Sequence, residues 1–583
     1  MNWKDWNLDN KDKYYLIALF FISMLSFLRM MDYSLSGCIS NPDIALYLLS
    51  GLKYAGLDNF NVVNPNDLYY TPVISFLSSL FFRIGYVDKN AIIFVTSLFS
   101  FFGYFGFYLL LRNRFNSLLS LTGVIIFGCF PLMIVNIARG MIDVPAISVS
   151  IWALVFGIMA IDKNPKYFLI SFPLLTIGFF IKYVVAFSLP LIFLYYVMRR
   201  NFIFELDEII SDKSLFKDKI KNYIKSKEFK YLFASIIISI IIAGLICKTL
   251  ILDFGGEFLF FKQSASSLNS QLSSSTSNII DFNIDKSYYF DHFSDILFLS
   301  RRFNSLFTGI LYGIFGVGVL ISIFKFKDHL NKFKSEKNSF KTKYFEKLLY
   351  ISCLILIAMS LFSFKYLSNH MLSNICLLIF LTLSFAILQQ YKIKERVVSL
   401  DILFIAYFLV YFVFLSAYII KVPRYALPFI PPFVYLVIWG LNSIANALDD
   451  KKMKFNSGQA IPMVVLILFF IVTISVLIAP MDYDDSNEVY RDVYAHDFEN
   501  DLVEACNFII ENDPDYHNKT FSSNYHNSRI IRWYLNVNLT IMDEDVSLKH
   551  YDETDYVIHN QNRSLINYNK NDFGRFHVYN KYV

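Results

Sequence analysis

Five ionisable residues lie where apolar segments of the chain begin or end: Asp43, Asp143, Lys182, Lys421 and Arg424. A carboxylate can take the proton of an acceptor hydroxyl, and cations can hold and stabilise a phosphate leaving group. Two carboxylates and three cations in one place would therefore support general-base catalysis on a substrate that carries a phosphate. The elements around these residues must then bring them together.

Two of the five residues also have a purely structural interpretation. Asp43 follows Pro42 at a predicted helix start, where a carboxylate complements the helix dipole. Lys182 lies between apolar residues, and such a lysine can lay its stem along a helix and place its ammonium group at the membrane surface. Both alternatives stay open on these residues alone.

The composition indicates which solvent surrounds most of the chain. Of its 583 residues, 55% are hydrophobic and 17% are charged, and the mean hydropathy is +0.45. Soluble domains are less apolar and more charged, so a typical soluble enzyme is excluded. Disorder is excluded as well, because 62 Phe and 39 Tyr supply abundant apolar surface. The net charge of +5 is too small to indicate a nucleic-acid partner. Membrane lipids must therefore solvate much of the chain.

About thirteen apolar runs are long enough to cross a bilayer as helices, which takes roughly 20 residues each. We place them near residues 14–31, 90–111, 117–136, 144–161, 167–181, 184–198, 231–251, 304–324, 348–364, 371–389, 399–420, 426–443 and 460–480. Residues 1–480 are therefore expected to form a polytopic α-helical membrane domain.

The connections between these runs alternate in charge. The positive-inside rule places connections rich in Lys and Arg in the cytoplasm. These basic stretches lie at 112–114, 163–166, 199–230, 325–347, 392–396 and 451–454. The other set is poorer in Lys and Arg, and residues 482–583 hold 19 acidic and 9 basic residues. We therefore expect a multi-pass protein of the cell membrane with a cytoplasmic N-terminus and an extracytoplasmic C-terminal segment.

Two large outer loops are expected between the spans. The first, 32–89, contains the apolar stretch 68–85, which is short for a span and is interpreted as a helix in the membrane interface. The second, 252–302, contains a Ser-rich stretch at 263–277. Interfacial helices in these loops would lie beside the outer ends of the spans.

The C-terminal segment, 481–583, has a different pattern. Its apolar runs shrink to strand length at 540–542 and 557–558, and a helical pattern covers 502–510. We expect a small extracytoplasmic α/β domain here.

Lys421 and Arg424 carry positive charge on the outer side, where such charge is normally depleted. An anion bound at this face explains them better than topology does. His370 stands at the outer end of another span. A lipid-linked phosphosugar would present its phosphate at this depth in the membrane.

The order of several motifs resembles the GT-C superfamily of glycosyltransferases that use polyprenyl-phosphate sugars, the group that includes protein O-mannosyltransferases and the aminoarabinose transferase of lipid A. The matching segments are Asn41-Pro42-Asp43 with Tyr47, Tyr70-Thr71-Pro72, Arg139 with Asp143-Val144-Pro145, Phe179-Phe180-Ile181-Lys182, and Lys421-Val422-Pro423-Arg424-Tyr425-Ala426-Leu427-Pro428. The last segment is the most specific, because it is similar to an Arg-Tyr-x-x-Pro sequence at the start of a late span in this family. The resemblance covers about residues 40–450.

The resemblance implies a role for each matching residue. Asp43 would be the general base toward the acceptor, and Asp143 would be its supporting acidic residue. Arg139, Lys182 and Arg424 would lie at the phosphate of the lipid-linked donor.

Five further residues complete the predicted site. Lys421 is expected to join the donor-phosphate group, and Tyr425 is expected to pack against the lipid. Tyr47, Tyr70 and His370 are expected to line the substrate pocket.

Taken together, these inferences predict an integral membrane glycosyltransferase that acts with inversion on the outer face. Its donor would be a sugar on a polyprenyl phosphate of the dolichyl or undecaprenyl type, and its acceptor a protein, a lipid or a glycan. No cofactor is expected, since the lipid-linked donor is a substrate. No metal is expected either: six of the nine histidines lie in the C-terminal segment without the spacing of a metal site.

Two other classes of membrane protein are alternatives to this prediction. A polytopic transporter or flippase of lipid-linked or small solutes would also span the membrane many times, but charges at the midplane and matching halves, which are typical of transporters, are missing. An oligosaccharyltransferase is a closer rival. The five tryptophans contain no Trp-Trp-Asp sequence, which argues against that class.

Overall fold

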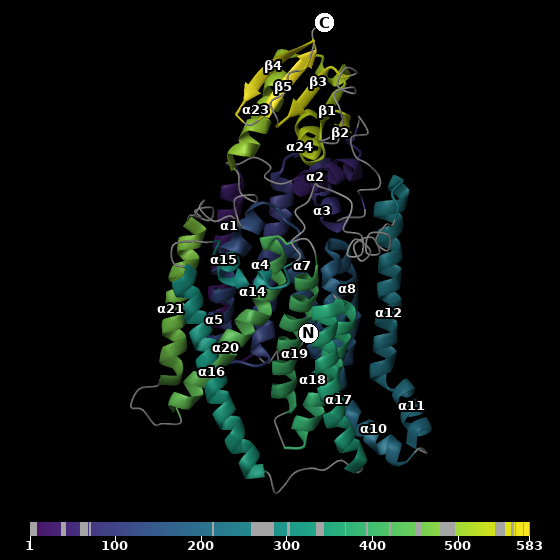
Figure 1. Cartoon of the computed structure of the whole chain (residues 1–583), viewed down its shortest axis with the longest axis vertical. Coiled ribbons are helices and arrows are strands. Elements are labelled where there is room, and N and C mark those ends of the chain that lie inside the picture. Colours follow the sequence, from purple (N-terminus) through teal and green to yellow (C-terminus); the bar gives the residue numbers. More distant parts are fainter. Residues whose placement is uncertain are drawn as a thin grey trace.

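The computed structural model describes residues 8–35, 42–58, 68, 72–212, 215–257, 285–299, 304–333, 343–367, 369–391, 395–418, 421–449, 457–478, 496–542, 554–560, 565, 567–574 and 576–581. In this part of the chain, a bundle of long helices carries two short helices and a sheet at one end (Figure 1). That end of the bundle is termed the site end, and the other is termed the opposite end. The Ser-rich stretch 263–277 and Tyr70 lie outside the described residues.

Ten helices are long and apolar enough to cross a membrane. They are α1 (Asp12–Leu35), α4 (Asn90–Arg112), α7 (Asp143–Asp162), α12 (Lys227–Ile246), α16 (Asn304–Phe333), α17 (Lys343–Phe362), α18 (His370–Gln389), α19 (Glu395–Ala417), α20 (Ile430–Asp449) and α21 (Ser457–Ile478). The chain is a multi-pass integral membrane protein, as the sequence predicted.

Three further apolar segments account for the rest of the thirteen predicted runs. Two are bent pairs, which raise the number of candidate spans to twelve, and the third is shorter than a span. The pairs are α5 (Ser117–Gly128) with α6 (Pro131–Ala138), bent by 61°, and η4–α9 (Tyr183–Phe187, Ser188–Arg199) with α10 (Phe202–Ser211), bent by 56°; the short segment is η3–α8 (Pro165–Tyr167, Phe168–Ile181). Every predicted run is therefore helical, but the described helices include ten to twelve candidate spans rather than thirteen.

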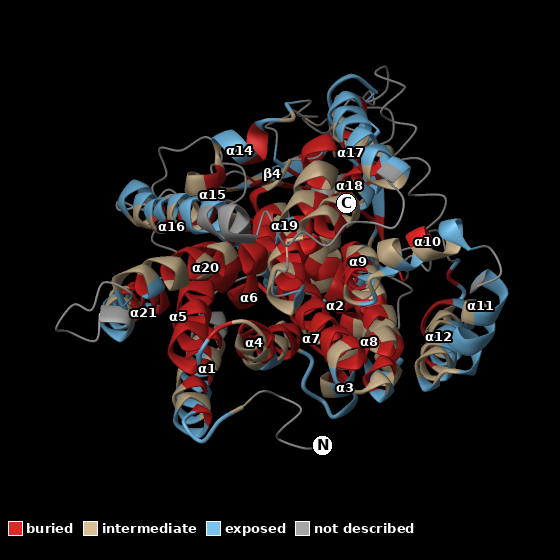
Figure 2. Ribbon diagram, turned by 90° about the horizontal axis from the view of Figure 1, so that it is seen from below, coloured by how far each residue is buried: buried red, intermediate tan, exposed pale blue. Residues whose placement is uncertain are grey.

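The helices differ in how much of their surface other helices cover. α7 lies in the centre of the bundle and is buried along nearly its whole length, whereas α12 and α16 lie at its edge (Figure 2). The exposed side chains of α12 include Phe233, Ile240 and Ile241. Such apolar surface is favourable only against lipid, so α12 and α16 face the hydrocarbon and α7 forms the core.

Two short helices follow α1, in the loop where the sequence predicted helices at the membrane interface. They are α2 (Pro42–Ala55) and α3 (Pro72–Arg83), and at 14 and 12 residues both are too short to span. They pack closely, because a Cβ atom on Gly51 would lie 2.9 Å from Cε2 of Phe82. Together they lie between the bundle and the sheet (Figure 1).

Shorter elements make the remaining connections. A π-helical turn is a frequent interruption of a helix at a functional or strained position. The connecting elements are α11 (Leu215–Lys225), η5 (Cys247–Ile251, π), η6 (Leu252–Phe254), α14 (Tyr288–Asp291), α15 (Phe293–Phe298), η8 (Ser363–Leu367, π) and η9 (Pro423–Phe429, 3₁₀).

The C-terminal segment forms the small α/β unit that the sequence predicted. Its sheet has the strand order β2-β1-β3-β5-β4, in which β2, β1 and β3 are parallel and β5 is antiparallel to β3 and β4. The elements are α23 (His496–Asn512), η10 (Tyr516–Asn518), β1 (Phe521–Asn524), α24 (Tyr525–Leu535), β2 (Leu539–Met542), β3 (Tyr556–His559), β4 (Tyr568–Phe573) and β5 (Phe576–Lys581). Because β1 and β2 are parallel neighbours, α24 crosses between them and is held against the sheet.

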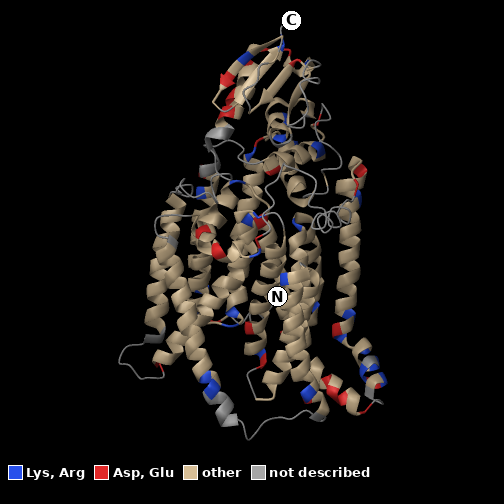
Figure 3. Ribbon diagram, in the orientation of Figure 1, with Lys and Arg blue, Asp and Glu red and all other residues tan. Residues whose placement is uncertain are grey.

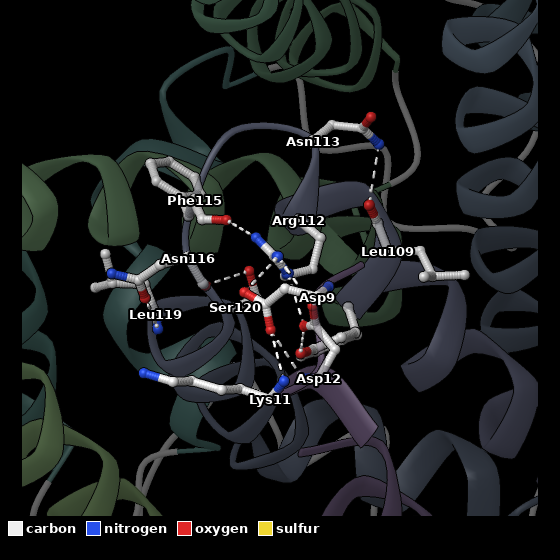
Figure 4. A network of polar contacts seen from close by, with 11 residues as sticks. Asp9, Lys11, Asp12, Leu109, Arg112, Asn113, Phe115, Asn116, Leu119 and Ser120 are labelled. Atoms are coloured by element: carbon white, nitrogen blue, oxygen red, sulfur yellow. Dashed lines mark hydrogen bonds and ion pairs between the residues drawn. The ribbon is translucent and has the colours of Figure 1, made fainter. Parts of the chain in front are cut away.

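Charged residues gather toward the two ends of the bundle (Figure 3). At the opposite end, Asp12 pairs with Arg112 of α4, with 2.8 Å between Oδ1 and Nε (Figure 4). Asp401 pairs with Arg114, with 3.1 Å between Oδ1 and Nε, and accepts the hydroxyl of Tyr435. Pairing of this kind is required where a charge leaves water, since an isolated buried charge is very costly.

Asp162, the last residue of α7, is another buried carboxylate at this end. It is 3% exposed and accepts bonds from Nε of Arg199 (2.9 Å), Nε of Arg396 (2.7 Å) and the hydroxyl of Tyr195 (2.8 Å). These partners come from α9 and α19, so one carboxylate ties three helices together.

We predict that Asp162→Ala lowers the free energy of unfolding by about 3–5 kcal/mol, because two arginines would lose their buried counter-ion. Thermal unfolding of the purified protein in detergent would measure this change. Asp32→Ala is the matched control: its carboxylate is 68% exposed and pairs with Arg29, so the change should stay within about 1 kcal/mol. Equal effects of the two substitutions would contradict the structural role of Asp162.

Candidate active site

Asp43 lies at the site end because α2 begins where the sequence predicted. Pro42 occupies the first position of α2, where its missing N–H is not needed, and Asp43 follows in the first turn. Tyr47 lies one turn further on the same helix and is buried, at 6% exposed. α2 therefore presents a carboxylate and a phenol side by side.

Asp143 is positioned by the sharp turn between α6 and α7. Gly140 has φ +76°, and a Cβ atom there would also lie 2.9 Å from Cγ2 of Ile92, so only glycine suits this turn. α7 then begins at Asp143, whose side chain is 4% exposed. Arg139 ends α6 just before the turn and is buried.

Lys182 lies at the break between α8 and η4. Its backbone is extended, which ends α8 and directs the following residues into a new helix. Its ammonium group forms an ion pair with Oδ1 of Asp143. The interpretation of Lys182 as a lysine that reaches toward water is therefore wrong, because its side chain is largely buried and paired inside the protein.

Arg424 comes from the proline-rich turn η9 and reaches across to α2. Its Nη2 donates to Oδ2 of Asp43 at 2.6 Å, although the two residues are 381 positions apart in the chain. Its Nη1 lies 3.7 Å from the sulfur of Met141. The ring of Tyr425 lies between the two cations, 4.8 Å from Nζ of Lys182 and 5.7 Å from the guanidinium carbon of Arg424.

A further cation joins the cluster from the C-terminal unit. Nη1 of Arg529, on α24, lies 3.5 Å from Oδ1 of Asp43. Arg529 was not among the predicted site residues. The sequence around it offers one indication of a role, which is that Arg529 is basic within an acidic segment. Asp43 therefore lies between two guanidinium groups.

The charge cluster formed by Asp43, Asp143, Lys182, Arg424 and Arg529 has three cations and two carboxylates. It carries a net positive charge, which favours an anion at this site. Burial raises the pKa of Asp43, but Arg424, Arg529 and Lys182 outweigh burial and hold the pKa below its ordinary value of 3.8. The carboxyl of Asp43 is thus ionised at neutral pH, and it is accessible because 31% of its side chain is exposed.

Two predicted site residues make their described contacts elsewhere. Nζ of Lys421 donates to the carbonyl groups of Leu415, Ser416 and Tyr418, at the C-terminal end of α19. The ring of His370 lies 5.0 Å from the ring of Phe414. Lys421 therefore caps a helix in this structure, and the substrate roles of both residues stay predictions.

Two cavities lie near the site end. A water-sized cavity of about 10 Å³ lies behind the Asp143–Lys182 pair and is also lined by Tyr407 and Tyr411. A larger one, of about 490 Å³, lies between α2, α3 and the end of α12. Its lining residues are Tyr54, Phe76, Arg83, Thr249, Leu250, Asp253 and Phe254. Aromatic rings with a few polar groups are typical of sites for small ligands, and this cavity has the size of one.

A metal site is not evident in the part of the chain that the structure covers. Within the described ranges, no group of three His, Cys, Asp or Glu side chains is placed to hold an ion.

Comparisons with known proteins found one matching family model and several similar folds. Residues 69–206 match the model of the dolichyl-phosphate-mannose-protein mannosyltransferases, a segment that includes Arg139, Asp143 and Lys182. The fold is similar to that of ArnT from Cupriavidus metallidurans in the apo state, with a TM-score of 0.52 and 9% identity over 97% of this chain and 98% of that chain. It is also similar to the same protein bound to undecaprenyl phosphate, with a TM-score of 0.50 and 10% identity over 98% of each chain. The chain therefore shares its fold with ArnT, and its segment 69–206 is similar to the mannosyltransferase family.

Other comparisons add less. The archaeal oligosaccharyltransferase AglB from Archaeoglobus fulgidus, in complex with an inhibitory peptide and a dolichol-phosphate, matches with a TM-score of 0.47 and 11% identity over 95% of this chain and 70% of that chain. No curated protein matches this chain in sequence.

We predict strong energetic coupling between Lys182 and Asp143. Lys182→Gln should lower the free energy of unfolding by about 3–5 kcal/mol, because it leaves a buried carboxylate without its counter-ion. The double variant Lys182→Gln/Asp143→Asn should be more stable than Lys182→Gln alone. A double-mutant cycle measured by thermal unfolding tests this, and additive effects of the two substitutions would refute it.

Proposed function

We propose that this protein is a membrane glycosyltransferase that moves a sugar from a polyprenyl phosphate to an acceptor hydroxyl, with inversion, and that Asp43 is the general base. The observation that carries the proposal is the Asp43–Arg424 pair, in which a carboxylate and a guanidinium, both partly exposed, are in direct contact. The family match and the undecaprenyl phosphate bound to ArnT support a lipid-linked donor.

The reaction is a single displacement. The acceptor oxygen attacks the anomeric carbon on the face opposite the phosphate, and its proton passes to a carboxylate oxygen of Asp43. The bond between the anomeric carbon and the phosphate oxygen breaks, and its electron pair stays on the phosphate. One such displacement inverts the anomeric centre.

The cations have a second role in this step. The donor is a phosphodiester with one negative charge, and the departing polyprenyl phosphate carries up to two. Arg424 and Lys182 would meet the charge that develops, and Arg139 lies at the end of α6, just before the turn that leads to Asp143. Asp143 holds Lys182 in place through their ion pair.

The site end is assigned to the extracytoplasmic side. The basic connections of the chain include 199–230 and 325–347, and they follow helices that run away from the charge cluster. The positive-inside rule places such basic connections in the cytoplasm. The acceptor, whether a protein, a lipid or a glycan, would then be reached outside the cell.

Asp43→Asn should leave the fold intact and lower the rate of sugar transfer by about 10²–10⁴-fold, because the amide cannot accept the proton. Transfer is measured with purified protein and lipid-linked donors from its own host, and thermal unfolding checks the fold. Asp32→Asn serves as a control of the same chemistry. A wild-type rate in Asp43→Asn would remove Asp43 from the mechanism.

The substrates themselves can be identified in cells. Mass spectrometry of membranes from cells that carry wild-type protein, Asp43→Asn or no protein should reveal one polyprenyl-phosphate sugar that accumulates without activity, together with one acceptor that loses the sugar. Unchanged glycan profiles with a redistributed solute would instead indicate a transporter.

Arg424→Gln should raise the KM for the lipid-linked donor, because the guanidinium would no longer bind the phosphate. Steady-state kinetics with varied donor concentration measures this effect. An unchanged donor KM would mean that the phosphate binds elsewhere.

A further inference from the structure

The C-terminal unit is seated on the bundle through one helix. α24 lies over α2 and α3 (Figure 1), and the ring of Trp533 lies 6.0 Å from the ring of Phe82 on α3. Asn524 caps α24, since its side chain accepts from the backbone N–H of Asn527 at 3.0 Å. The helix is thus fixed at its start, by the sheet and by an aromatic contact below it.

This seating places Arg529 at Asp43. The side chain of Arg529 is 14% exposed, and its Nη1 lies 3.5 Å from Oδ1 of Asp43, while the other carboxylate oxygen is bound by Arg424. The two guanidinium groups come from different parts of the molecule. Arg424 belongs to the helical bundle, and Arg529 belongs to the C-terminal unit.

We propose that Arg529 is a positioning residue for the general base, so that the C-terminal unit completes the active site. This inference rests on the proposed role of Asp43. When the donor binds, its phosphate competes with Asp43 for Arg424, and a carboxylate held by Arg424 alone would become free to rotate. Arg529 keeps its hold on Oδ1, and a carboxylate has enough lone pairs to accept the acceptor hydroxyl as well.

The size of the effect follows from geometry. A displacement of about 1 Å in a catalytic group can cost about 10²-fold in rate. Loss of Arg529 should therefore lower kcat much more than it alters the KM for the donor, whose phosphate it does not bind. Loss of Arg424 should act mainly on that KM.

Arg529 also influences the proton affinity of Asp43. The charged and titratable groups that face Asp43 are Arg424 and Tyr425 from η9, Arg529 from α24, Lys182 from the α8–η4 break and Tyr47 from α2 itself. Removing one of the three cations raises the pKa of Asp43. Because Asp43 acts as the base only when ionised, the acidic limb of the kcat/KM profile should move to higher pH.

The test compares Arg529→Gln, Arg529→Lys and Arg532→Gln in full-length protein in detergent. Arg532 lies on the same helix but donates to the carbonyl group of Leu539 within the C-terminal unit, at 2.7 Å, so it controls for damage to that unit. Arg529→Gln should lower kcat by about 10-fold to 100-fold and shift the acidic limb upward. Arg529→Lys should restore most of kcat and the position of the limb, and Arg532→Gln should leave the limb unchanged.

Two results would overturn the inference. One is a wild-type kcat and pH profile in Arg529→Gln. The other is a lower kcat that Arg529→Lys does not restore and that comes without a shift of the limb, since this pattern indicates a structural role alone. Asp43→Asn distinguishes a failure of the proposed function from a failure of the role assigned to Arg529. Activity in that variant refutes the proposed function, whereas an inactive Asp43→Asn beside a wild-type Arg529→Gln refutes only the role of Arg529.

Discussion

The exclusion of unpaired charge from an apolar interior organises this molecule. Lipid offers no hydrogen bonds and little screening, so the chain places its ionisable groups at the ends of the helices and pairs them there. Asp143 and Asp162 illustrate the rule, because they lie at the two ends of the buried helix α7, about 30 Å apart at 1.5 Å per residue. Each is bound to a cation from another part of the chain. The same rule therefore joins the helices at the opposite end and assembles the site.

The two ends use their ion pairs differently. At the opposite end, Asp162 is closed in by two arginines and a tyrosine, and nothing further is needed to satisfy it. At the site end, the cluster has one cation more than it has carboxylates, and Asp43 is partly exposed. An excess of cations around an exposed carboxylate is stable only where water or an anion can reach it, and under the proposed function that anion is the donor phosphate.

Local signals predicted the parts of the fold that depend on local physics. The apolar runs indicated the helices, Pro42 indicated the start of α2, and the onset of an apolar run indicated the start of α7 at Asp143, because helix starts and lipid-facing segments depend on a few neighbouring residues. The bend between α5 and α6 and the short α8 were not anticipated, since hydropathy reports length but not direction. Lys421 shows the same limit: its place beside Arg424 suggested a phosphate ligand, but its side chain turns back to cap α19.

The contact between Arg529 and Asp43 could not be predicted from neighbouring residues in the sequence. This contact joins residues at nearly opposite ends of the chain, and it depends on how the β1–α24–β2 crossover sits on α2 and α3. Only tertiary packing determines that arrangement. It also means that Asp43 has both of its guanidinium partners only when the C-terminal unit is docked on α2 and α3. Asp43, which α2 positions early in the sequence, therefore receives one partner from the bundle and one from the C-terminal unit, and the folding of both ends of the protein is coupled to a single carboxylate.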